Sequence, residues 1–290
     1  MSVIPELKQP FLIPPMMTFS GMWFALLQSN GKQMNDKTQV SIAATGDLHC
    51  TKKSRDNVQN VLSAMADAAD ILVLAGDLCD TGLVEEAEIL AQKIKTLKTP
   101  VVAVLGNHDF ESGKALEIET ILTEAGVYLL DGKSCEIYDV GFAGVKGFCG
   151  GFGDKALQAW GEQAIKDFVY ASVEESLKLE SALAKLRTPQ KIAILHYAPI
   201  VETTLGEPPE IAPFLGSSRL EEPINRYPVT AVFHGHAHRG SPEGTTAQHI
   251  PVYNVAKPLL ERTYTDRPPF RLLKINHDER KSEIGHELGA

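Results

Sequence analysis

The chain of 290 residues has few cysteines, a deficit of positive charge and no apolar run long enough to cross a bilayer. Its four cysteines include no Cys-x-x-Cys pair, which argues against a disulfide framework and a thiolate zinc site. The formal net charge of −9 argues against nucleic-acid polymers and membranes as partners, because both attract clustered cations. A reducing cytoplasm is therefore the expected location.

The first 36 residues do not fit the pattern of the rest of the chain. Prolines interrupt this segment, and its apolar stretch over residues 16–27 is too short to span a bilayer. A signal peptide is a poor match, because a single lysine precedes the stretch and no Ala-x-Ala site follows it. We expect residues 1–36 to be a poorly ordered leader, and we hypothesise that translation begins at Met34. Residues 37–276 then form one domain, followed by a polar tail over 277–290.

Strand-like and helix-like segments alternate along this domain. In the first half, helices are expected over residues 56–69, 85–97 and 115–125, between short apolar runs. This alternation is typical of βαβ units on a parallel sheet and predicts a doubly wound first half. In the second half, apolar residues recur at helical spacing over 162–186 and predict a long amphipathic helix. That helix either forms a homodimer face or covers the sheet, and the sequence leaves both open.

Five of the apolar runs end in a turn that carries Asp, Asn or His. The turns are Gly46-Asp47-Leu48-His49, Gly76-Asp77-Leu78-Cys79-Asp80, Gly106-Asn107-His108-Asp109, His196-Tyr197 and Gly235-His236-Ala237-His238. Because strand ends of the same sense gather at one edge of an α/β sheet, we expect these side chains to converge. Their oxygen and imidazole donors suit divalent metals, so the sequence predicts a metallohydrolase.

These five turns, in this order, resemble the motifs of the calcineurin-like metallophosphoesterases: Asp-x-His, Gly-Asp-x-x-Asp, Gly-Asn-His-Asp/Glu, a lone His and Gly-His-x-His. The resemblance covers about residues 38–256. It implies an α/β fold built as a four-layer α-β-β-α sandwich, with two mixed sheets and a dinuclear metal site at the carboxyl-terminal edge of the strands. It also implies two divalent metal ions, with manganese favoured and iron, zinc or nickel tolerated.

The same resemblance implies a role for each of these residues. The first ion would be held by Asp47, His49, Asp77 and His238, and the second by Asp77, Asn107, His196 and His236. A water between the ions would lose a proton near neutral pH and attack phosphorus in line with the leaving oxygen. His108 would donate a proton or a hydrogen bond to that oxygen. The carboxylate of Asp80 would orient His108 and favour its protonated form.

Two positions bear on the substrate. Protein Ser/Thr phosphatases of this superfamily carry phosphate-gripping arginines where this chain has Thr81 and Leu105. The motifs look more like those of class III cyclic nucleotide phosphodiesterases, so the expected substrate is a small phosphodiester. Phosphomonoesterase or protein phosphatase activity is one alternative. A non-catalytic binding scaffold is another, although such scaffolds usually lack ligands that this chain retains.

Four residues beside the turns are secondary candidates. Asp109 either supports the metal ligands from behind or caps the following segment. His234 is expected to be a packed strand residue rather than a ligand. Cys50 and Cys79 are expected to be small buried hydrophobes.

Overall fold

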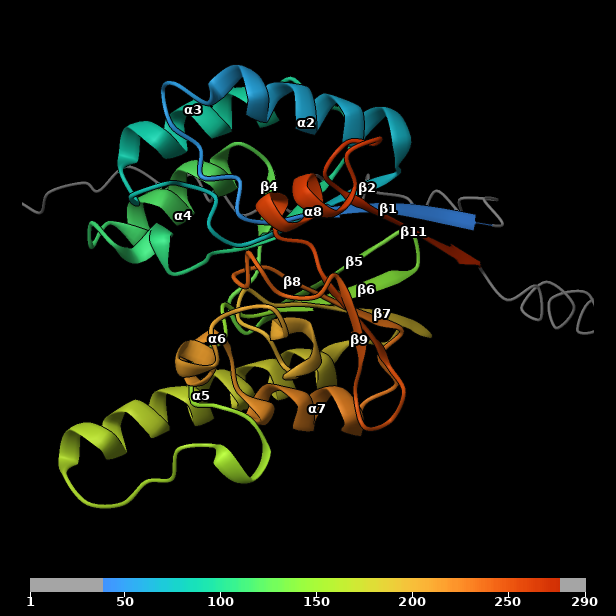
Figure 1. Ribbon diagram of the computed structural model, residues 1–290. Coiled ribbons are helices and arrows are strands. Elements are labelled where there is room, and N and C mark those ends of the chain that lie inside the picture. Colours follow the sequence, from blue (N-terminus) through green and yellow to red (C-terminus); the bar gives the residue numbers. More distant parts are fainter. Residues whose placement is uncertain (1–38, 277–290) are drawn as a thin grey trace, which may run out of the picture. The chain divides into compact units, whose positions relative to one another are not determined.

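Two β-sheets lie face to face at the centre of the fold, and helices cover the outer face of each sheet (Figure 1). The computed structural model describes residues 39–276. The expected leader and polar tail lie outside the described residues. Within them, the four-layer α-β-β-α arrangement confirms the architecture expected from the sequence.

The first sheet has the strand order β11-β1-β2-β3-β4. Its parallel strands are β1 (Gln39–Thr45), β2 (Ile71–Ala75), β3 (Val101–Val104) and β4 (Val127–Leu129). The edge strand β11 (Arg271–Asn276) runs antiparallel to β1 and makes the sheet mixed. The connecting helices are α2 (Arg55–Ala68), α3 (Val84–Ile94) and α4 (Ala115–Glu124).

Both faces of this sheet are apolar because each packs against another layer. In β2, Leu72 and Leu74 contact the core under the helices, whereas Ile71, Val73 and Ala75 contact the core between the sheets. Residues from α2, α3 and α4 all belong to the first of these cores. The expectation of a doubly wound first half is therefore wrong, because the second sheet occupies the face that a second helix layer would cover.

The second sheet has the strand order β5-β6-β7-β8-β10-β9. Its strands are β5 (Lys133–Ile137), β6 (Val140–Gly144), β7 (Gln190–Ile194), β8 (Ala231–His234), β9 (Glu243–Thr245) and β10 (Pro251–Asn254). The four central strands are parallel, and the edge strands β5 and β9 are antiparallel to their neighbours. This sheet is therefore also mixed, as expected.

The long helix α5 (Gln163–Lys185) covers the second sheet, where Leu179, Ala182 and Leu183 join its outer core. A dimer face on this helix stays a prediction. The remaining helices are α6 (Ala212–Leu215), α7 (Glu221–Arg226) and α8 (Lys257–Thr263), with 3-10 turns η1 (His108–Phe110), η2 (Gly153–Lys155), η3 (Glu202–Thr204), η4 (Pro209–Ile211) and η5 (Ser218–Leu220). Among the helices of the described residues, none is long and apolar enough to cross a bilayer.

Candidate metal centre

The five turns found in the sequence follow β1, β2, β3, β7 and β8, and their side chains converge at one edge of the facing sheets. Three groups of three ligand atoms form there among the described residues, namely Asp47, His49 and His238, then His49, Asp77 and His108, and then Asp77, His196 and His236, and the atoms of each group lie within 4.8 Å of one another. We name Asp47, His49 and His238 the shallow cluster. We name Asp77, Asn107, His196 and His236 the deep cluster; Asn107 belongs to it because its Oδ1 lies 2.9 Å from Nε2 of His196.

The backbone of these turns is unusual at the ligands themselves. Positive φ angles occur at Asp47 (54°), His49 (43°), Asp77 (47°) and His236 (69°). Each such residue costs on the order of 1–3 kcal/mol and persists only where the surrounding structure enforces it. Strain of this kind gathers at functional sites, so its presence at four predicted ligands supports their role.

Glycines in these turns allow carboxylates to approach the backbone closely. A Cβ atom on Gly106 would overlap the carboxylate of Asp77, and one on Gly235 would overlap the carboxylate of Asp47. Any larger residue would push these acids away from the site. The Gly-Asn-His and Gly-His-x-His turns therefore require glycine for a steric reason.

In the deep cluster, main-chain groups hold both the buried acid and the buried imidazole. Nδ1 of His196 donates to the carbonyl of Ala75 at 3.0 Å, while its Nε2 lies 3.3 Å from Oδ1 of Asp77. The main-chain N–H of His108 donates to the same Asp77 oxygen at 2.9 Å. Because the Ala75 carbonyl fixes the proton on Nδ1, Nε2 is the atom that can bind a cation.

Charge pairing overrides burial at this acid and imidazole. Burial alone would raise the pKa of Asp77, but the attraction and hydrogen bond of His196 hold that pKa below its usual range. Burial alone would lower the pKa of His196, but Asp77 raises it to about 9. Burial lowers the pKa of His236 to about 4, with a further contribution from the charge of His196. A cation in the deep cluster would replace the His196 proton as the positive partner of Asp77.

The shallow cluster is organised around Asp47. Nε2 of His238 lies 2.9 Å from Oδ1 of Asp47, a hydrogen bond that raises the pKa of His238. The main-chain N–H of His236 lies 3.0 and 3.1 Å from the two Asp47 oxygens. These contacts fix the carboxylate beside the histidines.

His49 provides the sharpest test of whether a metal ion fits. Both of its ring nitrogens are buried and lack a hydrogen-bond partner among the described residues. Leaving a buried polar atom unpaired costs about 1–3 kcal/mol, and a coordinated cation would remove that cost. Together with the carboxylate, amide and imidazole donors around it, this orphaned ring fits a divalent metal ion.

Asp80 and His108 meet through the main chain rather than through the expected side-chain pair. Nδ1 of His108 lies 2.6 Å from the carbonyl oxygen of Asp80, whereas the Asp80 carboxylate lies 3.3 Å from Nδ1 of His49. The carboxylate nearest to Nδ1 of His108 among the ion pairs of the described residues is that of Glu111, at 3.5 Å. A neutral carbonyl can orient the His108 ring, but it lacks the full negative charge that would favour protonation.

Asp109 supports the deep cluster from behind. Its carboxylate is fully buried and accepts three main-chain hydrogen bonds, from Leu78 (3.1 Å), Cys79 (2.7 Å) and Gly106 (2.8 Å). These bonds tie the turn that carries Asp77 to the turn that carries Asn107. Burial raises the pKa of Asp109 to about 6. The sequence left open whether Asp109 supports the metal ligands or caps the following segment, and these hydrogen bonds favour support of the ligands.

The other secondary candidates behave as packing residues. His234 is buried in β8, where Nε2 lies 2.8 Å from Oγ1 of Thr203, so its expected role as a packed strand residue is confirmed. Cys50 and Cys79 are free, buried thiols in the core beneath the first helix layer. These cysteines fill space beside the turns, as expected.

One contact to the site was not anticipated. Arg262 donates from Nη1 to the carbonyl of His238 at 2.9 Å, and it comes from α8, a helix that sequence patterns did not indicate. The Tyr197 ring centroid lies 4.4 Å from that of His236.

Comparison with known proteins agrees with this geometry. The profile of the calcineurin-like phosphoesterase family matches residues 40–240, a span that holds all five turns. Among curated proteins, none matches the chain in sequence. The solved phosphopantetheinyl hydrolase of Mycobacterium tuberculosis superposes with a TM-score of 0.62 at 14% identity, covering 81% of this chain and 96% of that one. The protein TT1561 of Thermus thermophilus superposes with a TM-score of 0.48 at 16% identity, covering 82% and 99%.

At 14% identity, the likeness to the phosphopantetheinyl hydrolase shows the fold alone. The family profile covers most of the described residues, and the side chains at its motifs converge in three overlapping groups of metal-ligand atoms. The chain therefore belongs to the calcineurin-like phosphoesterase family and is a metal-dependent phosphoester hydrolase.

Proposed function

We propose that the chain is a phosphodiesterase for small phosphodiesters that uses two divalent cations, with Mn²⁺ as the favoured ion. One observation supports the choice of diesters. At the two positions where protein phosphatases carry arginine, Thr81 hydrogen-bonds to Glu86 and Leu105 is buried. Neither position presents a cation to a phosphate group. A diester carries one negative charge fewer than a monoester dianion, so it has less need of those guanidinium groups.

In this proposal the shallow and deep clusters each hold one cation, and Asp77 contributes to both. The sets are Asp47, His49, Asp77 and His238 for the first ion, and Asp77, Asn107, His196 and His236 for the second. The distance of 3.9 Å between Oδ2 of Asp77 and Nε2 of His49 supports this sharing, because Oδ1 lies toward His196. When bound, the cation pair supplies an activated water and neutralises charge on the phosphoryl oxygens.

His108 is the proposed general acid. Its Nδ1 is held by the carbonyl of Asp80, which leaves the other ring nitrogen to donate to the leaving oxygen as the P–O bond breaks. The side chain is 37% exposed, so a substrate can reach it. One His108 ring nitrogen also lies within 4.8 Å of ligand atoms of His49 and Asp77, and this closeness supports a role for His108 beside the cations.

The test compares bis(4-nitrophenyl) phosphate with 4-nitrophenyl phosphate on chelator-treated protein reloaded with Mn²⁺. We expect kcat/KM for the diester to exceed that for the monoester by at least about tenfold, with about two Mn²⁺ per chain by elemental analysis. A faster monoester reaction would make the enzyme a phosphomonoesterase. No hydrolysis of either ester with Mn²⁺, Fe²⁺, Zn²⁺ or Ni²⁺ would contradict the catalytic proposal and support a scaffold.

A further inference from the structure

A pocket of about 170 Å³ is lined by Leu105 and Phe110, the two residues that flank the Gly106-Asn107-His108-Asp109 turn of the metal centre. Its lining includes residues directly beyond the carboxyl ends of three strands: Leu105 after β3, Leu130 and Asp131 after β4, and Lys146 beyond β6. Helices α4 and α5 supply the remaining walls. We name this space the Lys146 pocket.

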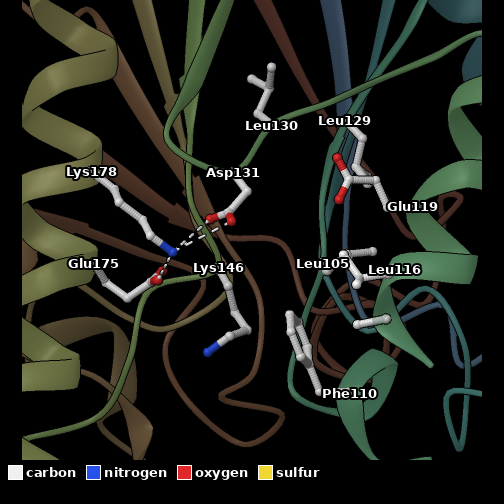
Figure 2. A pocket seen from close by; sticks show the side chains of 11 residues that line it. Leu105, Phe110, Leu116, Glu119, Leu129, Leu130, Asp131, Lys146, Glu175 and Lys178 are labelled. Atoms are coloured by element: carbon white, nitrogen blue, oxygen red, sulfur yellow. Dashed lines mark hydrogen bonds and ion pairs between the residues drawn. The ribbon is translucent and has the colours of Figure 1, made fainter. Parts of the chain in front are cut away.

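The pocket has two chemically different walls (Figure 2). One wall is mainly apolar and comes from the ends of β3 and β4, from η1 and from α4, with Leu105, Phe110, Leu116 and Leu129, and the carboxylate of Glu119 also lies on this side. The facing wall is charged and comes from the ends of β4 and β6 and from α5, with Asp131, Lys146, Glu175 and Lys178. An apolar wall opposite a few polar groups is the usual construction of a small-molecule site.

Direct contacts connect the pocket to the deep cluster. The carbonyl of Lys146 accepts hydrogen bonds from the main-chain N–H groups of His196 (3.0 Å) and Tyr197 (3.1 Å). Phe110 lines the pocket and ends the 3-10 turn that His108 begins. The pocket therefore shares the η1 turn with His108, the proposed donor to the leaving oxygen, and the Lys146 segment with the turn of His196.

Among the charged residues that line this pocket, Lys146 is the one without an ion-pair partner in the described part of the chain. Glu119 lies 2.7 Å from the ammonium of Lys133, and Glu175 lies 2.9 Å from that of Lys178, which also contacts Asp131. In contrast, no carboxylate among residues 39–276 lies within 4.0 Å of the Lys146 ammonium. This ammonium donates instead to the neutral carbonyl of Gly147, at 3.0 Å.

Aromatic rings hold this ammonium in place. The Nζ atom of Lys146 lies 5.0 to 5.4 Å from the ring centroids of Phe110, Phe148 and Tyr197. Burial lowers the pKa of Lys146, and the charge of Glu175 opposes that shift in part. Cation–π contacts orient a charged group but do not neutralise it, so a bound anion would gain from this position.

We propose that the Lys146 pocket receives the leaving group of the diester and that Lys146 pairs with a carboxylate or phosphate carried on that group. This inference rests on the proposed function. The volume suits one ring or a short apolar chain, since an apolar cavity of roughly 150 Å³ is known to hold benzene. The substrate class is thus a small diester whose leaving alcohol combines an apolar body with a second anionic group.

The test uses 4-nitrophenyl diesters that differ only in the second phenol. One probe carries a 3-carboxy-4-nitrophenyl group, and its matched neutral probe carries the corresponding carboxamide. We expect wild-type protein loaded with Mn²⁺ to prefer the carboxylate probe by about tenfold in kcat/KM, as one charged hydrogen bond allows. Lys146→Met, which keeps an apolar stem among the rings, should abolish that preference, so that the ratio of kcat/KM for the two probes falls to about one.

Two further variants serve as controls. Lys146→Arg should retain the preference because it keeps the positive charge. Lys274→Met removes an exposed charge from β11, far along the chain from the pocket, and should retain it as well. A wild-type enzyme that hydrolyses both probes equally would overturn the proposal, and so would a Lys146→Met variant that slows both probes to the same extent. A third probe, whose second phenol carries a phosphate group in place of the carboxylate, then shows which of these two anions Lys146 prefers.

A binding measurement separates this inference from the proposed function. The free phenol 5-hydroxy-2-nitrobenzoate is titrated into chelator-treated protein by calorimetry, where no hydrolysis can occur. We expect affinity at least about tenfold above that of its amide in wild-type protein, and equal affinities in Lys146→Met. Equal affinities in wild-type protein would refute the pocket assignment even if the enzyme is a phosphodiesterase. If the carboxylate phenol binds as expected but the metal-loaded protein hydrolyses no diester, the phosphodiesterase proposal is refuted and the pocket assignment stands.

Discussion

The deep and shallow clusters differ in what holds their ligands. In the deep cluster, His196 is fully buried and both of its ring nitrogens have hydrogen-bond partners, in Ala75 and Asn107. In the shallow cluster, the side chains of His49 and His238 are 20% and 39% exposed, and His49 lacks any hydrogen bond from its ring among the described residues. Hydrogen bonds within the protein therefore position the His196 ring of the deep cluster, whereas no hydrogen bond among the described residues positions the His49 ring of the shallow cluster.

This difference implies unequal metal affinities. Ligands that are already positioned lose little conformational freedom when a cation binds, so the deep cluster should retain its ion more tightly. Substitutions at Asp77, Asp109 and Asp80 should therefore change the two metal affinities to different extents.

Asp77→Asn should have the largest effect because the carboxylate faces both clusters. An amide provides one neutral oxygen in place of two charged ones, so it cannot bridge two cations. We expect kcat/KM for bis(4-nitrophenyl) phosphate to fall by about a thousandfold or more, with fewer than two Mn²⁺ bound per chain. Elemental analysis and steady-state kinetics on the same preparation measure both. Full metal occupancy with normal turnover would show that Asp77 is not shared.

His108→Ala should act on the reaction and spare both clusters. We expect turnover to fall by about a hundredfold or more while two metal ions remain bound. The loss should be smaller for diesters with more acidic leaving groups, which depart without a proton donor. Loss of either metal ion would instead identify His108 as a ligand, a role that its closeness to His49 and Asp77 would permit.

Asp109→Asn should loosen the deep cluster selectively. Replacing one carboxylate oxygen by an NH₂ group leaves a buried main-chain N–H without its acceptor, at a cost of about 1–3 kcal/mol in unfolding free energy. We expect the tighter of the two Mn²⁺ affinities to weaken by about tenfold or more, measured by electron paramagnetic resonance titration. A change confined to the weaker affinity would reverse the assignment of the clusters.

The sequence was sufficient to predict that the five turns meet, because Asp, Asn and His recur at the ends of successive strands. Turns such as Gly76-Asp77 follow buried strands, and parallel strands bring such turns to one edge. The strand and helix pattern also located most elements to within a few residues. It missed α8 and the short strands β4 and β9, which have too few residues to show a period.

Contacts that depend on the path of a loop could not be predicted. The carboxylate of Asp80 faces His49 and not His108, because a turn of a few residues can direct the side chain to either ring. Lys146 stands out only when Phe110 and Tyr197 are placed around it, and these residues are remote from one another in the chain. The spacing of residues in the sequence does not predict such contacts.

Asp80→Asn should have the smallest effect on turnover and should act on the shallow cluster. Its carboxylate lies 3.3 Å from Nδ1 of His49, where it can orient the ring and raise the basicity of the other nitrogen. We expect the weaker Mn²⁺ affinity to fall by about tenfold, with kcat at saturating Mn²⁺ within about threefold of wild type. The main-chain bond from His108 to residue 80 survives this substitution, so the general acid keeps its orientation. A large fall in kcat at saturating metal, with both affinities unchanged, would show instead that the Asp80 carboxylate serves His108 during the reaction.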